Sequence, residues 1–288
     1  MTKLIAEIGI NHGGKLDNAI ELIKQASLAN VWGVKFQYRS EGFFAKNDEM
    51  GSTLIKSELE RSNLNNSWIK DLIKTAHENN LKVGFSFFRC SDLENFYHKN
   101  YIADFIKIPS AEFRNIQLIK LAKSKNVPVM VSYGGGSEEE IEKYIKLANF
   151  DKNDCVFHCI ANYPIAIGNQ QLSFIERLNS LTKAKIGYSS HDEEWEIVLL
   201  TLKYNIDYIE RHICLSKDDL GLDISTSSDP DDFQRMNKIL SNYDEIFSSS
   251  LRTPNQGEIL NIRNLGSGLY FDQNYSQKKI IEISDLIE

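Results

Sequence analysis

The sequence predicts a (β/α)8 barrel, also called a TIM barrel, followed by a short C-terminal extension. Eight short apolar runs with a strand-like composition recur between Leu4 and His212, and a segment with helical spacing of its apolar residues follows each one. Strand–helix alternation favours a parallel sheet, and eight repeats are enough to close that sheet into a barrel. The length of 288 residues is also close to the size of one such barrel.

The predicted strands are rich in aliphatic, β-branched and aromatic side chains, as expected for strands covered on both faces. Several alternate strictly, so that Lys35 and Gln37 share one face of their strand while Val34 and Phe36 share the other. In chain order, the strands are expected at Leu4–Gly9, Gly33–Gln37, Lys82–Ser86, Phe105–Ile108, Val127–Ser132, Asp154–His158, Lys185–Ser189 and Tyr208–His212.

The segments that follow the strands place apolar residues three and four positions apart, which is typical of helices with one buried face. Seven helices are expected between consecutive strands, and an eighth after the last strand. In chain order, they are expected at Asp17–Ala29, Ser67–Asn80, Asp92–Asn100, Asn115–Ser124, Ser137–Asn149, Leu172–Thr182, Glu193–Tyr204 and Pro230–Ser248.

Composition and charge exclude several classes of protein. The formal net charge of −7 disfavours a general nucleic-acid binder, because phosphate contacts require clustered cationic side chains. No apolar run approaches the roughly 20 residues needed to span a bilayer, and the first residues show no signal peptide. We therefore expect a cytoplasmic protein with neither a nucleic-acid nor a membrane partner.

The chain has four cysteines and no C-x-x-C pair, so reduced thiols are the expected state. Cys155 and Cys159 should point to the same side of a strand, where a metal or disulfide role is conceivable. Small buried side chains are the better-supported interpretation of both.

The domain organisation follows from where the periodic pattern stops. The catalytic barrel is expected to occupy residues 1–248. Within it, the longest irregular stretch is Tyr38–Asn66, which we interpret as a lid or rim over the barrel mouth because such long loops are usually functional. Residues 249–288 form a second region. It begins within the Ser-, Asn- and Gly-rich stretch Ser248–Gly268, which is typical of a linker, and its last part, Leu269–Glu288, is too short to build a core of its own.

Side-chain alternation predicts which polar residues face the inside of the barrel. Residues that face the helices should be aliphatic, so Lys35, Lys107, Glu210 and His212 are expected in the lumen. Burying a lysine without an anion is costly. Active sites of this fold lie at the carboxyl ends of the strands, where these residues occur.

Internal ion pairs, for example with Glu7 or Glu112, would explain one buried lysine as well as a ligand would. Two lysines together with two histidines at strand ends favour a site for a small anion beside a metal ion. His191 and His212 follow neighbouring strands, and two imidazoles with water and substrate oxygens suit a divalent ion such as Mn²⁺.

Further candidates surround this predicted mouth. The turn Val131–Gly136 ends a strand, and its backbone amides with the Ser132 hydroxyl could hold a phosphate, although a helix cap explains it nearly as well. His158 ends the sixth strand and could line the same mouth, and His12 in the loop after the first strand could touch a substrate.

The ordered set of motifs resembles the sialic acid synthase family. The resemblance runs from about residue 4 to residue 235, and the combination is specific although no single motif is. It is carried by Ala6-Glu-Ile-Gly-Ile-Asn-His12, Val34-Lys-Phe-Gln37, Ile106-Lys-Ile-Pro-Ser110, Cys159-Ile-Ala-Asn-Tyr-Pro164, Gly187-Tyr-Ser-Ser-His191, Glu210-Arg-His212 and Leu222-Asp223 through Asp229-Pro230.

The resemblance implies an enzyme that condenses phosphoenolpyruvate with an N-acylated aminosugar, N-acetylmannosamine-like, to a nonulosonic acid and phosphate. It implies a divalent metal at His191 and His212, Mn²⁺ first and Mg²⁺ or Co²⁺ as alternatives, and a homodimer. The residues that would carry the reaction are Glu7, Lys35, Lys107, Glu210 and Asp223. Those that would bind the substrates are Ser110, Ser132, Tyr163, Ser189, Asn162 and Gln37.

Departures from the family pattern affect mainly the sugar side. The family usually has Ser-Asp-His where this chain has Ser189-Ser190-His191, Thr-Gly-Met where it has Tyr133-Gly134-Gly135, and Ser-Gly-Glu where it has Ser110-Ala111-Glu112. It commonly has Pro and His beside the aspartate, where this chain has Leu222 and Ile224. In the family, a C-terminal antifreeze-like (SAF) domain follows the barrel, and residues 269–286 resemble the start of that domain.

Three other interpretations stay open at this stage. The same chemistry on another aldose would give a 3-deoxy-octulosonate-type product. A non-catalytic relative could serve as a binding or scaffold subunit, although it would have no reason to keep the buried lysines and histidines. A metal-dependent sugar isomerase on the same barrel is weaker, because that chemistry usually needs more carboxylate ligands.

Overall fold

The structure is a computed structural model that describes residues 2–40, 53–247, 252, 254–265, 269–271 and 277–279. It divides into two compact units, Met1–Tyr243 and Asp244–Glu288. The first unit contains the closed barrel, and the two units are described separately.

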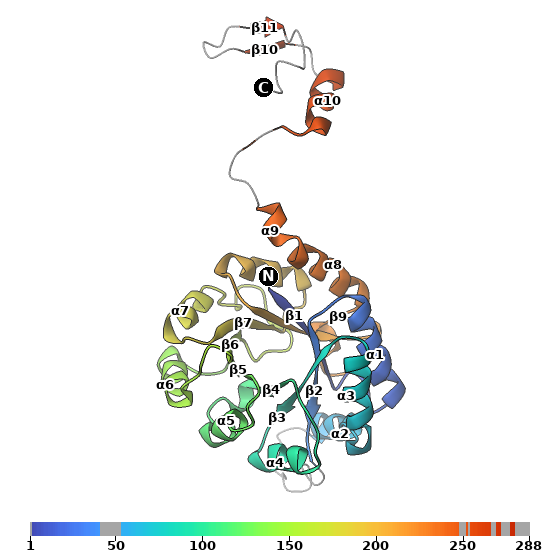
Figure 1. The fold of residues 1–288 in the computed structure, drawn as a ribbon, viewed down its shortest axis with the longest axis vertical. Coiled ribbons are helices and arrows are strands. Elements are labelled where there is room, and N and C mark those ends of the chain that lie inside the picture. Colours follow the sequence, from blue (N-terminus) through green and yellow to red (C-terminus); the bar gives the residue numbers. More distant parts are fainter. Residues whose placement is uncertain are drawn as a thin grey trace. The chain divides into compact units, whose positions relative to one another are not determined.

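Eight parallel strands form the barrel, and each pairs with the next one along the chain (Figure 1). Pairing of β1 with β8, in the register Glu7 opposite His212, closes the sheet into a cylinder. The expected (β/α)8 barrel is therefore confirmed. The strands are β1 (Lys3–Gly9), β2 (Gly33–Tyr38), β3 (Lys82–Phe87), β4 (Phe105–Ile108), β5 (Val129–Tyr133), β6 (Cys155–Cys159), β7 (Lys185–Ser190) and β8 (Tyr208–Ile213).

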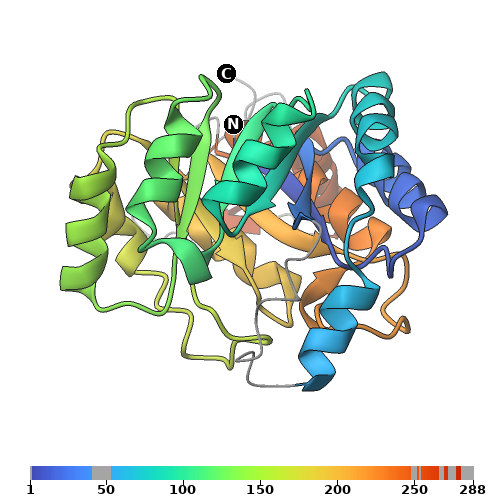
Figure 2. The same cartoon turned by 90° about the horizontal axis from the view of Figure 1, so that it is seen from below.

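Helices surround the cylinder and pack aliphatic side chains against the outer faces of the strands. Figure 2 shows this outer layer from the side. The helices of this layer are α1 (Leu16–Leu28), α3 (Ile69–Glu78), α4 (Cys90–His98), α5 (Ile116–Lys123), α6 (Glu138–Ala148), α7 (Phe174–Leu181), the 3-10 helix η4 (Trp195–Tyr204) and α8 (Pro230–Ser241). The expected cap of α6 is present, since the Ser137 hydroxyl accepts from the Glu140 amide at 3.2 Å.

Two expectations for the first unit were wrong in detail. The stretch expected to be irregular contains α2 (Thr53–Arg61) and η2 (Asn66–Trp68), while residues 41–52 lie outside the described part. Helix α2 is tied to the loop after β1, because Arg61 donates to the Gly13 carbonyl at 3.3 Å. The eighth helix ends at Ser241 and not at Ser248. Asn242 caps it by donating to the Lys238 carbonyl at 2.7 Å, and α9 (Tyr243–Ile246) follows.

The second unit contains α10 (Gln256–Leu265) and a short antiparallel pair, β10 (Leu269–Phe271) with β11 (Gln277–Lys279). The helix lies within the stretch expected to be a linker. Its first turn is a capping box, since the Glu258 amide donates to the Asn255 side chain and the Asn255 amide donates back to the Glu258 carboxylate. That signal is visible in the sequence. The likeness of this region to an antifreeze-like domain stays a prediction.

The bottom of the barrel interior is filled by apolar side chains, including Ile5, Phe105, Met130, Phe157 and Tyr208. The polar residues of the next layers therefore lie above a closed floor, at the carboxyl ends of the strands. No helix among the described residues combines the length and apolar character that crossing a bilayer requires.

Glycines in the strands make room for the two large rings of this floor. A Cβ on Gly84 would lie 2.2 Å from the Phe105 ring, and one on Gly187 would lie 2.5 Å from the Phe157 ring. We expect Gly84→Ala to lower the free energy of unfolding by about 1–3 kcal/mol, because it overpacks the floor.

Thermal denaturation of the barrel would measure this loss. Gly257→Ala, on the exposed helix α10, is the matched control and should leave the melting of the barrel unchanged. An unchanged melting temperature for Gly84→Ala would contradict the packing described here.

Candidate active site

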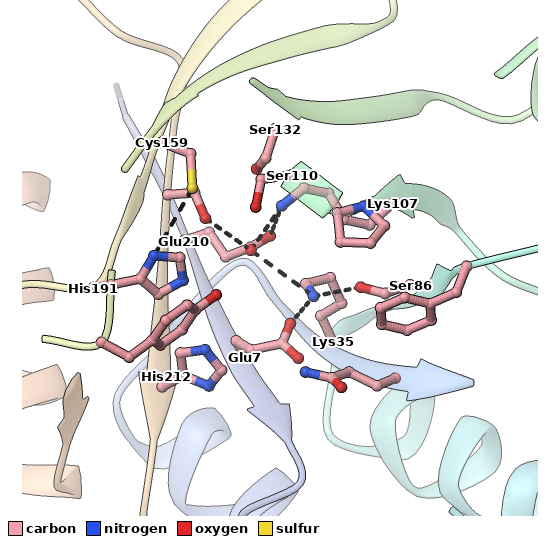
Figure 3. Close-up of a pocket in the computed structure, with 15 residues that line it drawn as sticks. Glu7, Lys35, Ser86, Lys107, Ser110, Ser132, Cys159, His191, Glu210 and His212 are labelled. Atoms are coloured by element: carbon pink, nitrogen blue, oxygen red, sulfur yellow. Dashed lines mark hydrogen bonds and ion pairs between the residues drawn. The ribbon is translucent and has the colours of Figure 1, made fainter. Parts of the chain in front are cut away.

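A polar pocket opens at the carboxyl ends of the strands (Figure 3). All eight strands contribute a side chain to its wall, so its composition depends on closure of the barrel. The lining residues are Glu7, Lys35, Gln37, Ser86, Phe88, Lys107, Pro109, Ser110, Ser132, Cys159, Tyr163, Ser189, His191, Glu210 and His212. Residues from positions 7 to 212 thus face one small space.

Two lysines and two glutamates occupy the centre of the pocket. The Lys107 ammonium donates to both carboxylate oxygens of Glu210, at 2.7 and 2.8 Å. Lys35 forms an ion pair with Glu7, donates to the Ser86 hydroxyl at 2.6 Å and lies 3.8 Å from a Glu210 oxygen. All four charged groups are at least 94% buried. The expected pair of lumen lysines is present, and Glu7 and Glu210 are their partners in this state.

Burial and the neighbouring charges shift the pKa values of these groups. Burial lowers the pKa of Lys35, and the Glu210 carboxylate opposes that change. Burial would raise the pKa of Glu210, but the positive charges of Lys107 and Lys35 outweigh it and hold the pKa at about 2. Glu210 is therefore ionised at neutral pH, and its negative charge holds the Lys107 ammonium group in the pocket.

Hydroxyl groups from three elements line the same wall as Lys107. Ser110 lies in the 3-10 helix η3 (Ser110–Glu112), Ser132 in β5 and Ser189 in β7. Ser189 donates to a Glu210 oxygen at 3.3 Å. The buried Ser132 hydroxyl has no hydrogen-bond partner in the described part of the chain. A buried hydroxyl without a partner is costly, so Ser132 is available to a ligand oxygen.

The two histidines face the pocket from the opposite side to the lysines, as Figure 3 shows. The His191 and His212 ring centroids are 5.7 Å apart. Nδ1 of His191 lies 3.1 Å from the Ile160 carbonyl oxygen, to which it can only donate, so Nε2 carries the lone pair. Burial lowers the pKa of both rings to about 3, which keeps them neutral. Neutral imidazoles are the form that binds metals.

These two rings fit a metal that completes its shell with water and substrate oxygens. The described residues contain no cluster of three or more His, Cys, Asp and Glu side chains that could hold an ion by themselves. Asp223 lies in the loop after β8, with a carboxylate oxygen 3.7 Å from Nδ1 of His212. Burial raises the pKa of Asp223, against the attraction of His191, Arg39 and Lys35.

The structure separates the other sequence candidates into two groups. Gln37, Ser110 and Tyr163 line the pocket, and the half-exposed Tyr163 ring packs 4.1 Å from the His191 ring. Asn162, one residue earlier in the same loop, is exposed and is not among the residues that line the pocket. A contact of Asn162 with the substrate stays a prediction.

Two histidines and one acid have other surroundings than expected. His158 faces the helices, where its Nε2 lies 2.7 Å from the Gln170 carbonyl oxygen and its ring stacks on Tyr188. Side-chain alternation places Cys159, and not His158, on the lumen side of β6. His12 is fully buried against Trp68 and is not one of the pocket residues. Glu112 accepts from Asn115, not from a lysine.

Some residues at or near the pocket were not among the sequence candidates for substrate or metal binding. Ser86 and Phe88 line the wall beside Lys35, and Cys159 lies 3.8 Å from Nδ1 of His191. Arg39 is buried, stacks on the Phe88 ring at 4.1 Å and donates to Gln37 at 2.9 Å. Ser86 could have been found by alternation from Gly84, and Arg39 by alternation from Lys35 and Gln37.

Comparisons with known proteins give a family match over most of the chain. A family model described as the NeuB family matches residues 22–251. The pseudaminic acid synthase of Campylobacter jejuni is 27% identical over 245 residues, which cover 81% of this chain and 71% of that protein. The spore coat polysaccharide biosynthesis protein SpsE of Bacillus subtilis is 28% identical over 244 residues, which cover 81% of this chain and 65% of that protein.

A solved structure shows the same fold along most of the chain. The N-acetylneuraminic acid (sialic acid) synthetase of Leptospira borgpetersenii has a TM-score of 0.76 and 25% identity, and the match covers 92% of each chain. The expected resemblance to the phosphoenolpyruvate-dependent, carbon–carbon bond-forming synthases of sialic-type acids is thus confirmed. The chain belongs to the NeuB family.

Proposed function

We propose that this protein condenses phosphoenolpyruvate with an N-acylated aminosugar of the N-acetylmannosamine type, giving a nonulosonic acid and inorganic phosphate. One observation carries the proposal: two buried lysines and two neutral imidazoles face each other across one pocket. The lysines suit an anionic donor, and the imidazoles suit the ion that would activate an aldehyde. The coverage of the NeuB model supports the reaction class.

Phosphoenolpyruvate carries a carboxylate and a phosphate, and both need cationic or hydrogen-bond donor partners. Lys35 and Lys107 supply the positive charge, and the hydroxyls of Ser110, Ser132 and Ser189 supply donors on the same wall. Lys107 already spans to Glu210, so an arriving anion competes with a carboxylate for the ammonium group. Charge-assisted hydrogen bonds of this kind are the strong ones.

The aldehyde of the sugar would lie on the histidine side of the pocket. A divalent ion held by His191 and His212, Mn²⁺ in this proposal, would polarise the aldehyde oxygen. The new bond joins C3 of phosphoenolpyruvate to the aldehyde carbon, and positive charge develops at C2. Water adds at C2, and phosphate then leaves with its bridging oxygen.

The carboxylates of the pocket would serve the water step. Glu210 is ionised and lies between the two lysines, so its charge stabilises the cationic C2 and it can accept a proton from the attacking water. Glu7 pairs with Lys35 through Oε2, while its Oε1 has no hydrogen-bond partner within the described ranges, so Oε1 can accept from the sugar or the water. Tyr163 and Asp223 border the sugar side.

Phosphate release from phosphoenolpyruvate tests this function directly. We expect release only when Mn²⁺ and an N-acylated aminosugar are both present, and we expect a chelator to abolish it until Mn²⁺ is restored. Mass spectrometry of the products across a panel of aldoses would separate a nonulosonate from a 3-deoxy-octulosonate-type product. Binding of phosphoenolpyruvate without turnover of any sugar would instead support a non-catalytic binding subunit.

A further inference from the structure

A partly buried amide, that of Asn11 in the loop after β1, connects this loop to the ends of β8 and β9. The side-chain nitrogen of Asn11 donates to the Ile213 carbonyl at 2.8 Å and to the Ser227 hydroxyl at 2.8 Å. Because the Ile213 carbonyl can only accept, the NH₂ group must face this side. Both of its hydrogens are then used, and the orientation of Asn11 is determined.

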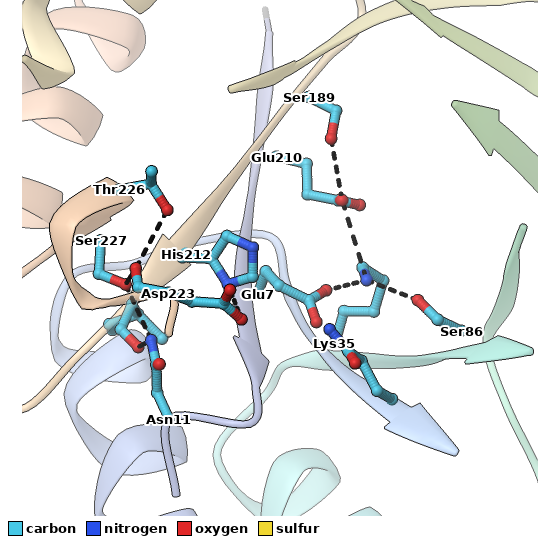
Figure 4. A network of polar contacts seen from close by, with 12 residues as sticks. Glu7, Asn11, Lys35, Ser86, Ser189, Glu210, His212, Asp223, Thr226 and Ser227 are labelled. Carbon is cyan, nitrogen blue, oxygen red and sulfur yellow. Dashed lines mark hydrogen bonds and ion pairs between the residues drawn. The ribbon is translucent and has the colours of Figure 1, made fainter. Parts of the chain in front are cut away.

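The contact continues from Ser227 to Asp223. The Ser227 hydroxyl donates to the Asp223 carbonyl at 2.7 Å, and the Thr226 hydroxyl donates to the same oxygen at 3.0 Å. Figure 4 shows this chain from Asn11 through Ser227 to Asp223, whose carboxylate points to His212. A hydroxyl has one hydrogen, so Ser227 can donate to Asp223 and still accept from Asn11.

The extra strand β9 (Ser227–Ser228) fixes where this chain ends. β9 pairs in parallel with β8 in the register His212 opposite Ser227. The 3-10 helix η5 (Ile224–Thr226) joins β9 to Asp223. Asp223 lies in the segment between the end of β8 and the start of β9. Asn11 binds both ends of this segment, Ile213 on β8 and Ser227 on β9. Asn11 does not itself line the pocket, and the Ile213 carbonyl that it binds directly follows His212.

We propose that Asn11 is a positioning residue that acts through Asp223. By fixing Ser227, it sets the height of the Asp223 backbone at the barrel mouth and so the approach of the Asp223 carboxylate to His212 and to the acceptor sugar. The inference rests on the proposed function, because it assigns Asn11 to the sugar side of that reaction. The lysine wall has separate supports, so binding of phosphoenolpyruvate should not depend on Asn11.

A double-mutant cycle between Asn11 and Asp223 tests the proposal on the full-length protein with Mn²⁺. We expect Asn11→Ala to lower kcat/KM for the aldose about tenfold, the rate equivalent of one hydrogen bond. Calorimetry should give a Kd for phosphoenolpyruvate within about twofold of wild type, because distant sites act independently. In an Asp223→Ala background, Asn11→Ala should change kcat/KM by less than about twofold.

Three further variants keep the test decisive. Ser227→Ala should reproduce the Asn11→Ala effect even if the latter folds poorly, and Ser227→Thr should restore activity because it keeps the hydroxyl. Asn237→Ala is the matched control and should have wild-type kinetics. Its amide also donates to a distant carbonyl, that of Asn30 at 3.2 Å, but it is exposed on α8, away from the pocket residues.

Three outcomes would each overturn the role of Asn11. The first is that the losses of kcat/KM multiply in the double variant. The others are that Asn11→Ala weakens phosphoenolpyruvate binding to the same extent, or that it has wild-type kinetics with the aldose. A wild-type protein that turns over no aldose would overturn the proposed function, and this inference with it.

Discussion

Replacing Lys107 by methionine is expected to reduce the affinity for phosphoenolpyruvate by about 10²–10³-fold, the cost of breaking a buried charge pair at a binding surface. Lys107 is 98% buried and supplies positive charge at the pocket floor. Without Lys107, the negative charge of Glu210 is less neutralised and repels the incoming anion. Isothermal titration with phosphoenolpyruvate would measure the loss.

Two further variants separate binding from folding in this experiment. Lys107→Met alone leaves Glu210 poorly compensated, so it should also lower the free energy of unfolding by about 3–5 kcal/mol. Adding Glu210→Gln should recover much of that stability without restoring affinity. Lys82→Met is the matched control, because Lys82 pairs with Asp104 at 3.1 Å but is exposed and does not line the pocket. Normal affinity in Lys107→Met would refute the assignment of Lys107 to the anion.

Replacing Arg211 by methionine is expected to lower the free energy of unfolding by about 3–5 kcal/mol, because it removes a buried charge that several groups depend on. Arg211 is 99% buried, between Glu210 and His212 on β8, and it points away from the lumen. It donates to the Ser228 hydroxyl at 2.6 Å, the Ser190 hydroxyl at 2.9 Å, and the carbonyls of Asp192 and Glu193 at 2.9 and 3.1 Å.

Urea denaturation would measure this loss. Arg177→Met is the control, because Arg177 also forms two ion pairs, with Glu138 and Glu142, but on the exposed surface, where such pairs contribute little. Arg211→Lys should retain part of the stability. An ammonium group can form some of these hydrogen bonds but cannot reproduce the planar arrangement of the guanidinium donors. Equal stability of the two methionine variants would show that the buried network adds nothing.

Strand periodicity was sufficient to predict the barrel and its polar lumen. A two-residue repeat is a local property, so Lys35, Lys107 and Glu210 could be assigned to the inside from their immediate neighbours. The same rule places His158 outside and Cys159 inside, and the error there came from counting His158 as a strand-end candidate without applying the alternation. Closure of the sheet followed from the number of repeats.

Loop residues were predicted less well than strand residues. Tyr163 and Asn162 are neighbours in one loop, yet Tyr163 packs on His191 and lines the pocket, while Asn162 does not line it. No periodic rule decides which of two adjacent loop side chains faces a pocket. Helix α2 was missed because polar contacts such as that of Arg61 with Gly13 tie it to the barrel, and such contacts leave no apolar pattern.

By itself, the sequence determined that Lys35, Lys107, Glu210 and His212 lie on the inward faces of their strands, because side-chain direction along a strand depends only on the parity of the position. Only the tertiary structure decided which of these charges meet. Lys107 pairs with Glu210 across 103 positions, and Asn11 reaches Ser227 across 216, because the closed sheet places β1 beside β8 and faces β4 toward β8 across the lumen. Such contacts depend on the closure and register of the whole barrel, which no short stretch of sequence contains.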